Sequence, residues 1–542
     1  MLFNSVEFFV FLAILYVAYL TLRHRGQNTL LLIGSYIFYG WWDVRFLFLI
    51  VVSTVVDYWC GLLIDRGTVA KRERGIASTW LILSSLAFLL IDWKVALQLA
   101  SGSSSGSTES ILRDGGLLIF CGSVVAVILA NLVYTKFVAI EEARRRKLAL
   151  LLSVVVNLGI LSFFKYFNFF IENIEDVIAA FGGEPENFRL DIVLPVGISF
   201  YTFQTMSYTI DVYRRRLDAT SNFFDFALFV SFFPQLVAGP IERAVNLIPQ
   251  VCSPRRLSRD QTFRGLHLIL YGLFKKVAIA DSVARTVDQV YGSSGAVSFA
   301  DVVIGTVFFA VQIYGDFSGY SDIARGTAKL LGFDLMMNFR NPYFSQNPKE
   351  FWTRWHISLS SWLRDYLYFS LGGNRGARGK TYRNLLATML LGGLWHGAAW
   401  NFVFWGLYQG TILCIHRMAM NVVWVTKILG RVPVVAKMIC FFGVTCYGWL
   451  LFRATSVGQI GDFTWTLLTD VGNLDFGASP PRAAAVFALP VLGVIELVEF
   501  RGNRPFYQSL PIPIWTGVYA VLLLGLAMGL VNEAAQFIYF VF

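Results

Sequence analysis

The chain has 542 residues, of which 56% are hydrophobic and only 15% are charged. These fractions lie far outside the range of soluble globular domains and exclude a chain that is folded in water throughout. The formal net charge of +10 does not indicate a nucleic-acid partner, because the basic residues cluster between apolar runs in alternate connections. The composition therefore predicts a polytopic membrane protein.

Apolar runs recur from residue 8 to residue 541, each close to the roughly 20 residues that a helix needs to cross the hydrocarbon core. We expect an all-α fold with about 11 to 13 transmembrane or re-entrant helices. The polar connections are short, so any chemistry has to be built from helices, short loops and interfacial segments.

The distribution of basic residues predicts the orientation of the first helices. Basic clusters within residues 66–74, 144–147 and 214–216 indicate cytoplasmic connections. The loops between them, the Ser/Gly-rich residues 101–110 and the acidic residues 171–191, are then external. The first apolar segment lacks a basic start and a small-residue cleavage site, so a cleaved signal peptide is not expected.

Residues 223–241 lie between two basic connections and form a short apolar segment that is broken by prolines and a glycine. Both ends of the segment are predicted to be on the cytoplasmic side. A re-entrant segment is therefore favoured over a full span, and an interfacial loop is the alternative.

His396 is the residue that most needs an explanation, because it lies among glycines and tryptophans within an apolar stretch. The local sequence is GGLWHGAAW at residues 392–400. Ionisable side chains are rare at membrane depth, since removing one from water costs several kcal/mol. The default interpretation is a functional histidine that faces a cavity.

A second histidine, His356, occurs in a segment with helical periodicity at residues 351–366. The large apolar side chains fall on one stripe of the predicted helix, and most polar side chains fall on the opposite side. The stripe consists of Phe351, Trp352, Trp355, Leu359, Trp362, Leu363 and Tyr366. A short, Trp-rich helix with arginines on its polar face is typical of the cytoplasmic interface. His356 lies at the edge of the stripe, where an ordinary interfacial histidine is an alternative to a catalytic one.

Together with further motifs, these segments resemble the membrane-bound O-acyltransferase superfamily. The similarity is to the branch that includes the alginate O-acetylation membrane protein and the teichoic acid D-alanylation protein. The motifs are SYIFYGWW (35–42), LPVGISFYTFQ (194–204), FPQLVAGPI (233–241), YGDFSGYSD (314–322), NPY (341–343), RWHIS (354–358) and WHG (395–397). Jointly they are very specific, and the similarity fades after about residue 453.

The resemblance implies transfer of an acyl group, in the first instance acetyl, from a cytoplasmic thioester for O-acetylation of an exported, alginate-like polysaccharide. His396 matches the catalytic histidine of the family, and His356 matches a second, supporting one. An imidazole that removes the hydroxyl proton during attack is worth roughly 10² to 10⁴-fold in rate. The sequence has no G-x-S-x-G elbow between a strand and a helix, since its match at residues 102–106 lies in the Ser/Gly-rich loop, so direct attack in a ternary complex is preferred over an acyl-enzyme. D-alanylation and peptidoglycan O-acetylation are alternatives.

The resemblance also implies one membrane domain over residues 1–542, arranged around a central funnel or tunnel. Within it we expect N-terminal helices in residues 1–220, a catalytic core in 221–420 and C-terminal helices in 421–542. No bound cofactor is expected, and the donor is acetyl-CoA or an acyl carrier protein. The expected partners are an extracytoplasmic acyltransferase, a polysaccharide acceptor and the lipid bilayer of a bacterial inner membrane; nucleic acid is not among them.

Several further residues are candidates for substrate binding: Trp395, Trp355, Asp316, Asp322, Asn341 and Arg375. Asp316 and Asp322 interrupt a long apolar run and could orient an imidazole or line the acceptor path. As an alternative, they are helix-end or loop carboxylates, if Gly315 and Gly319 break the helix there. Arg375 and its basic neighbours could meet the phosphates of the donor, although ordinary cytoplasmic positive charge is the favoured explanation.

The main alternative to an acyltransferase is a transporter or channel in which a buried histidine relays protons. Such a protein would more often show repeated halves and charged residues on several helices, and neither is found in the sequence. The six cysteines show no C-x-x-C pair and no zinc-type spacing with histidine, so no metal site is expected.

Overall fold

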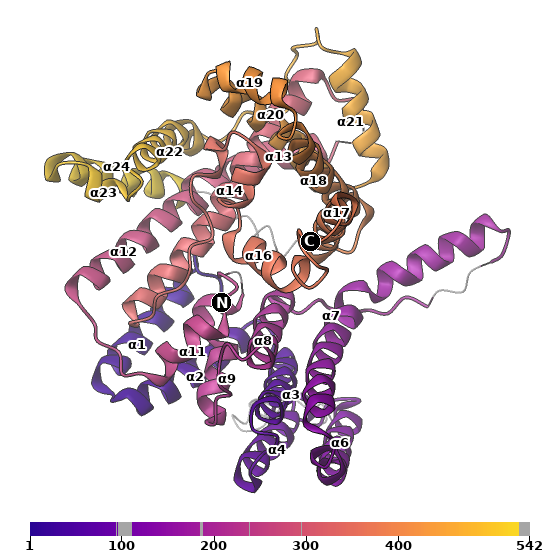
Figure 1. Cartoon of the computed structure of the whole chain (residues 1–542). Helices are drawn as coiled ribbons and strands as arrows, with labels where there is room; N and C mark the ends of the chain where they lie inside the picture. The colour runs from indigo at the N-terminus through magenta and orange to yellow at the C-terminus, as the bar shows by residue number, and fades with distance from the viewer. Residues whose placement is uncertain (94, 96–110, 185–187, 238, 294, 531–542) are drawn as a thin grey trace, which may run out of the picture. The chain divides into compact units, whose positions relative to one another are not determined.

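The computed structural model describes residues 1–93, 95, 111–184, 188–237, 239–293 and 295–530, and within these ranges the chain forms helices and no strand (Figure 1). The described residues pack as two units. The first unit comprises Met1–Val237, Ile241–Leu257 and Leu331–Asp334. The second comprises Ala238–Pro240, Ser258–Leu330 and Leu335–Phe542. The all-α prediction is confirmed, while the expected division at residues 220 and 420 stays a prediction.

The helices of the first unit come almost entirely from the first half of the chain. They are α1 (Val6–Thr21), α2 (His24–Gly40), η1 (Val44–Phe46), α3 (Leu47–Asp65), α4 (Lys71–Ser85), η2 (Leu86–Leu90), α6 (Gly116–Val138), α7 (Glu142–Ala180), α8 (Ile198–Tyr213), α9 (Phe223–Ser231), α10 (Phe233–Leu236) and α11 (Ala244–Cys252). The basic residues 144–147 lie within the first turns of α7, and the predicted orientation of these helices stays a prediction. The predicted external loop at residues 101–110 lies outside the described residues.

A buried polar cluster joins α3, α7 and α8. The carboxylate of Asp57 on α3 accepts hydrogen bonds from Ser153 Oγ at 2.6 Å and from Asn157 Nδ2 at 2.9 Å, both on α7. Thr205 on α8 donates to Asn157 Oδ1 at 3.2 Å. All four side chains are inaccessible to solvent. Because these groups satisfy one another, the cluster fixes the register of the three helices in an otherwise apolar interior.

The second unit holds both motif histidines. Its helices are α12 (Arg259–Leu273), η3 (Phe274–Ala280), α13 (Asp281–Tyr291), α14 (Phe299–Leu330), η4 (Pro342–Phe344), α15 (Pro348–Trp352), α16 (Ile357–Trp362), η5 (Leu363–Tyr368), α17 (Arg378–His396), α18 (Trp400–Ala419), α19 (Val423–Arg431), α20 (Val434–Arg453), α21 (Val457–Thr469), α22 (Ala483–Gly502), α23 (Phe506–Ser509) and α24 (Ile512–Leu530). In Figure 1, α17 and α18 lie side by side as an antiparallel pair.

Helix α14 runs unbroken through Gly315 and Gly319, so the expectation that these glycines could break it is wrong. Their role is close packing against the neighbouring helix. A Cβ on Gly319 would lie 2.6 Å from the carbonyl oxygen of Gly272 on α12, and a Cβ on Gly272 would lie 2.5 Å from that of Gly319. The absence of side chains therefore lets the two backbones touch.

Within the described residues, eight helices are long and apolar enough to cross a membrane, or nine if the bent pair α18 and α19 counts as one span. The eight are Val44–Asp65, Lys71–Leu90, Gly116–Val138, Glu142–Ala180, Phe299–Leu330, Val434–Arg453, Ala483–Gly502 and Ile512–Leu530. The predicted number of 11 to 13 crossings is not confirmed, in part because α1 has only 16 residues. The chain is nevertheless a multi-pass membrane protein.

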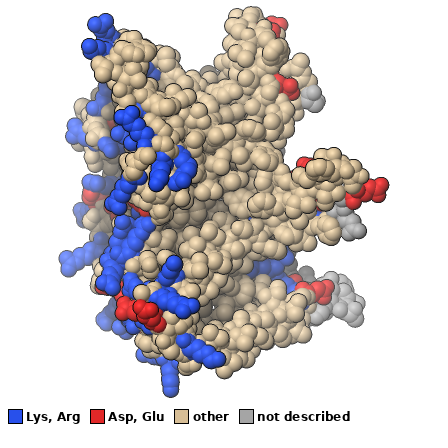
Figure 2. All heavy atoms as spheres, turned by 45° about the vertical axis from the view of Figure 1, so that its right-hand side comes forward, with Lys and Arg blue, Asp and Glu red and all other residues tan. Residues whose placement is uncertain are grey.

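Several helices expose large apolar side chains to an extent that is typical of membrane helices. On α6, Leu118 is 78% exposed and Leu132 is 66% exposed. Figure 2 shows broad areas of surface with neither acidic nor basic side chains. In water such patches would drive aggregation, so they are the lipid-facing surface.

The segment at residues 351–366 differs from the single amphipathic helix that its periodicity predicts. Helix α15 ends at Trp352, α16 begins at Ile357, and His356 between them has a left-handed backbone with φ of 41°. Backbone hydrogen bonds to the preceding loop replace the helical ones, from Arg340 N to Arg354 O and from Ile357 N to Asn338 O, both at 2.9 Å. Pairing with this loop therefore outweighs helical periodicity.

Residues 223–241 also avoid a single helix. Helices α9 and α10 are separated at Phe232, and neither is long enough to cross a membrane. Most of the described residues of the segment are buried. Two short helices exclude a full span, and the re-entrant segment stays a prediction.

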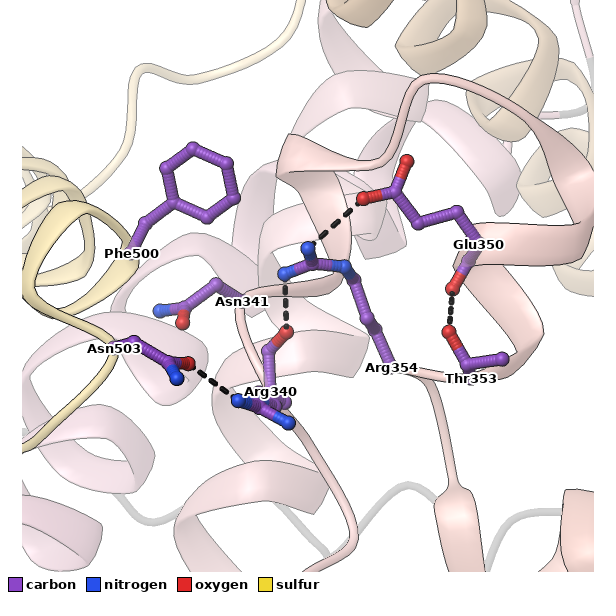
Figure 3. Close-up of a pocket in the computed structure, with 7 residues that line it drawn as sticks. All are labelled: Arg340, Asn341, Glu350, Thr353, Arg354, Phe500 and Asn503. Carbon is purple, nitrogen blue, oxygen red and sulfur yellow. Dashed lines mark hydrogen bonds and ion pairs between the residues drawn. The ribbon is translucent and has the colours of Figure 1, made fainter.

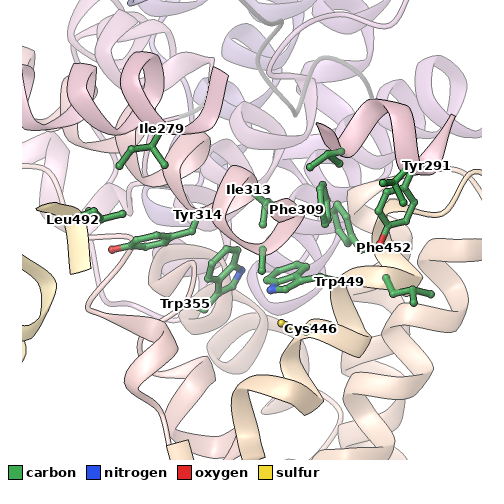
Figure 4. Close-up of a cluster of buried hydrophobic side chains, with 14 of the residues drawn as sticks. Ile279, Tyr291, Phe309, Ile313, Tyr314, Trp355, Cys446, Trp449, Phe452 and Leu492 are labelled. Carbon is green, nitrogen blue, oxygen red and sulfur yellow. The ribbon is translucent and has the colours of Figure 1, made fainter. Parts of the chain in front are cut away.

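An aromatic cluster forms the core of the second unit (Figure 4). Trp355 packs its ring on Trp449 at a centroid distance of 4.7 Å and is stacked on Phe351 at 5.6 Å. Phe452 belongs to the same cluster and also contacts the ring of His396, at a centroid distance of 5.3 Å. The core therefore extends to the first candidate catalytic residue.

Candidate active site

His396 is the last residue of α17 and is 5% exposed. Its position depends on the close pairing of α17 with α18, in which a Cβ on Gly406 would lie only 2.5 Å from the carbonyl oxygen of Met389. The next residue is also constrained, because a Cβ on Gly397 would lie 2.0 Å from a ring carbon of Phe402. The WHG motif thus combines a buried imidazole with a helix end that has no room for a side chain.

Aromatic rings surround the imidazole of His396. The rings of Trp395 and Trp405 lie at centroid distances of 5.0 and 5.1 Å and are both nearly perpendicular to it. These edge-to-face contacts hold the imidazole ring in one orientation.

His356 lies close to His396, with 6.5 Å between the ring centroids. It is completely buried, so the alternative of a solvent-bonded interfacial histidine is wrong. Its ring packs edge to face on Phe317 at 4.6 Å and lies 5.9 Å from Trp395. Burial lowers the pKa of His356 to about 3, so this imidazole is neutral at physiological pH.

Of the two candidate tryptophans, only Trp395 contacts the histidines. Trp355 belongs to the aromatic core described above, and its ring contacts are with Phe351, Phe339, Tyr314, Tyr343 and Trp449. Its position next to His356 in the chain serves to anchor that residue by packing.

Asp316 and Asp322 occur in buried ion pairs on α14. Lys276 Nζ lies 2.9 Å from Asp316 and 2.7 Å from Asp281, and all three side chains are at most 4% exposed. Asp322 pairs with Lys275 at 2.5 Å and with Arg325 at 3.0 Å. The carboxylates are therefore compensated by nearby cations, and their role in substrate binding stays a prediction. Asp316 directly precedes Phe317, the ring on which His356 packs.

Asn341 lines a small polar pocket of about 280 Å³ (Figure 3). Its Nδ2 donates to Glu496 Oε2 at 2.5 Å. The other lining residues are Arg340, Glu350, Thr353, Arg354, Phe500 and Asn503. Arg354 is held by Glu350 at 2.9 Å. The pocket braces the loop that positions His356, and His396 does not line it.

A larger cavity of about 780 Å³ begins at His396. Buried or half-buried side chains line its inner part, among them Trp352, Leu363, Met389 and Trp405. The basic residues Lys349, Arg364 and Arg417 also line it and are exposed, so they mark its open end. The cavity thus joins a basic surface to the buried imidazole through a largely apolar passage.

Arg375, the predicted contact for donor phosphates, is exposed but does not line this cavity. The basic residues at the open end belong to segments that are far apart in the sequence, near residues 349, 364 and 417. His416, which also lines the cavity, precedes Arg417 near the end of α18. No local motif joins these residues, so the sequence offered no signal for them beyond general positive charge.

Comparison with known proteins identifies the family. The profile of MBOAT, the membrane-bound O-acyltransferase family, matches residues 188–457, which include both motif histidines. A probable alginate O-acetylase of Pseudomonas aeruginosa is 39% identical over 508 residues, covering 93% of this chain and 82% of that protein.

Two other relatives have different acceptors in their names. A peptidoglycan O-acetyltransferase of Helicobacter pylori is 34% identical, and the match covers 61% of this chain and 67% of that protein. A teichoic acid D-alanyltransferase of Bacillus subtilis is 24% identical, and the match covers 50% of this chain and 71% of that protein. From the motifs, the buried histidine pair and these matches, the chain belongs to the membrane-bound O-acyltransferase family and is an O-acyltransferase.

Proposed function

We propose that this enzyme transfers an acetyl group from a cytoplasmic thioester to a hydroxyl acceptor, with His396 as the general base, for O-acetylation of an exported, alginate-like polysaccharide. The observation that carries the proposal is the cavity that leads from exposed basic residues to the buried imidazole of His396. Its volume of about 780 Å³ lies within the range of ligand sites.

The chemistry of the lining fits a phosphopantetheine thioester, the part that coenzyme A and an acyl carrier protein share. Lys349, Arg364 and Arg417 would hold the phosphate groups at the open end. The apolar passage would take the pantetheine arm, and the thioester would reach His396. Arg364 is already paired with Asp365 at 2.7 Å. Lys349 and Arg417 would therefore contribute more of the electrostatic attraction for the donor phosphates.

The histidine pair would divide the work of proton transfer. His396 takes the proton of the acceptor hydroxyl as oxygen attacks the thioester carbonyl, and returns it to the departing sulfur. His356, buried and neutral, does not line the cavity and would orient His396 from behind. The ring-centroid separation of 6.5 Å places the two imidazoles close enough for this role.

The acceptor, partner and membrane are part of the same proposal. The alginate O-acetylase relatives support an alginate-like polysaccharide as the final acceptor, and the peptidoglycan relative supports an alternative with the same hydroxyl chemistry. A separate extracytoplasmic acyltransferase would receive the group outside a bacterial inner membrane and pass it to the polymer. An acyl group that enters from the cytoplasm and leaves outside requires a funnel or tunnel across the bilayer.

The direct test measures thioester consumption by the purified protein in detergent, with acetyl-CoA, an acetylated acyl carrier protein and a D-alanylated carrier as separate donors. Arg417→Glu should raise the donor KM roughly tenfold at low salt, and the effect should shrink as salt screens the charge. Arg431→Glu, which changes another exposed arginine outside the cavity lining, is the matched control. Equal effects of the two variants would contradict the assignment of the open end. Turnover with the D-alanyl donor alone would contradict acetyl transfer.

A further inference from the structure

Trp405 belongs to none of the sequence motifs, but it contacts His396, the candidate base, directly. It lies on α18, is 1% exposed, and packs its ring edge to face on His396 at a centroid distance of 5.1 Å and an angle of 86°. It also lines the cavity through which the donor is proposed to enter.

The indole N–H of Trp405 is buried, and no hydrogen-bond acceptor lies within reach of it among the described residues. A buried donor without a partner is destabilising, and buried tryptophans usually find an acceptor. The half-buried Trp80, by comparison, donates its N–H to the hydroxyl of Tyr36 at 3.4 Å. A ligand that brings an oxygen to this wall of the cavity would supply the acceptor that the indole N–H of Trp405 lacks.

We propose that Trp405 Nε1–H is the oxyanion donor of the transfer reaction, binding the thioester carbonyl oxygen as negative charge develops on it. This inference rests on the proposed function. The acceptor oxygen forms a bond to the carbonyl carbon while His396 takes its proton, and the carbonyl π pair moves onto the oxygen that faces Trp405. The intermediate then collapses, the C–S bond breaks, and the sulfur leaves with the proton from His396.

The position of the group suits this role. A donor that is fixed by packing and shielded from water stabilises developing charge without having to reorganise during the reaction. The same α17 and α18 pairing holds both His396 and Trp405, so the proton acceptor and the oxyanion donor keep a constant spacing.

Trp59 on α3 provides a control outside the cavity. Its N–H is also buried without an acceptor among the described residues, and Trp59 does not line the cavity. Trp405, by contrast, contacts the imidazole of His396 directly. The two residues therefore test whether a buried N–H without an acceptor matters in general or only beside the base.

The experiment compares Trp405→Phe with Trp59→Phe in the thioester assay. Trp405→Phe should lower kcat about 10²-fold with the donor KM nearly unchanged, since only the transition state loses an interaction. Trp59→Phe should stay within a few-fold of wild type. A kcat for Trp405→Phe within about threefold of wild type, or a change in KM alone, would overturn the proposal. Absence of turnover in the wild type with every donor would instead reject the proposed function itself.

A second measurement separates the lost N–H from lost packing. Replacing Trp405 by benzothienylalanine keeps the ring shape and removes only the N–H, so kcat should fall as in Trp405→Phe while the melting temperature stays close to that of wild type. The carbonyl stretch of a bound ketone analogue of the thioester should shift to lower wavenumber in wild type and lose that shift in this variant. An unchanged stretch in both proteins would refute the hydrogen bond.

Discussion

Gly397→Ala tests whether the helix end that carries His396 must be free of side chains. In the structure the added Cβ would lie 2.0, 2.3 and 2.8 Å from three ring carbons of Phe402. The ring would have to move by about 1.4 Å to reach the 3.4 Å of ordinary contact. Phe402 is only 4% exposed, so the ring has little space into which it can move.

Overpacking of this kind costs about 1–3 kcal/mol of stability. The backbone of Gly397 has φ of −160°, which any residue adopts, so the clash and not backbone strain is the cause. Part of the displacement should pass to His396, the adjacent residue. A misplacement of about 1 Å at a catalytic group lowers the rate about 10²-fold, and this is the expected fall in kcat.

The assay is thioester consumption in detergent, together with a melting temperature for each variant. Gly443→Ala on α20 is the control, because a Cβ added there would have no atom within 4 Å and should leave kcat unchanged. Adding Phe402→Leu to Gly397→Ala should restore part of the activity, since the smaller side chain vacates the clashing volume. Wild-type kcat and stability in Gly397→Ala would contradict this explanation of the helix end.

Further variants test the histidines, the polar cluster and the topology. His396→Ala should abolish acyl transfer in a protein that still folds; activity within about threefold of wild type would be too high for a lost general base. His356→Ala should reduce activity non-additively with His396→Ala, whereas independent multiplicative losses would place His356 outside the catalytic unit. Asp57→Ala should lower stability by about 1–3 kcal/mol, seen as a lower melting temperature, because its buried partners lose their acceptor. A cytoplasmic thiol probe should label Arg375→Cys and an external one Glu184→Cys; labelling of both from one side would overturn the orientation.

The position of His356 illustrates where sequence periodicity is insufficient. Apolar residues at helical spacing in residues 351–366 predict one helix, and the side chains of that stripe are indeed largely buried. The backbone nevertheless turns at His356, because Asn338 and Arg340 compete for its hydrogen bonds. The competing hydrogen bonds join residues that are 14 or more positions apart in the sequence. A local sequence pattern cannot predict them.

The carboxylates on α14 show the same limit. Asp316 and Asp322 within an apolar run suggested a functional site or a helix end. The structure excludes the helix end and pairs both carboxylates with lysines of η3, while their role in substrate binding stays a prediction. Charge compensation depends on which helix packs against α14. Close glycine contacts between α12 and α14 determine this packing. The sequence contains both lysines but nothing that assigns them to these partners.

The membrane class, the all-α fold, the family and the two motif histidines are all evident in the sequence, because composition, run length and short motifs are local properties. Helix packing was needed to show that the two imidazoles lie 6.5 Å apart and that Lys349, Arg364 and Arg417 share a cavity with His396. Packing also brings Trp405, which no motif includes, onto the imidazole of His396. These relations join segments up to 68 residues apart, from Lys349 to Arg417, and depend on contacts between helices that no local spacing encodes.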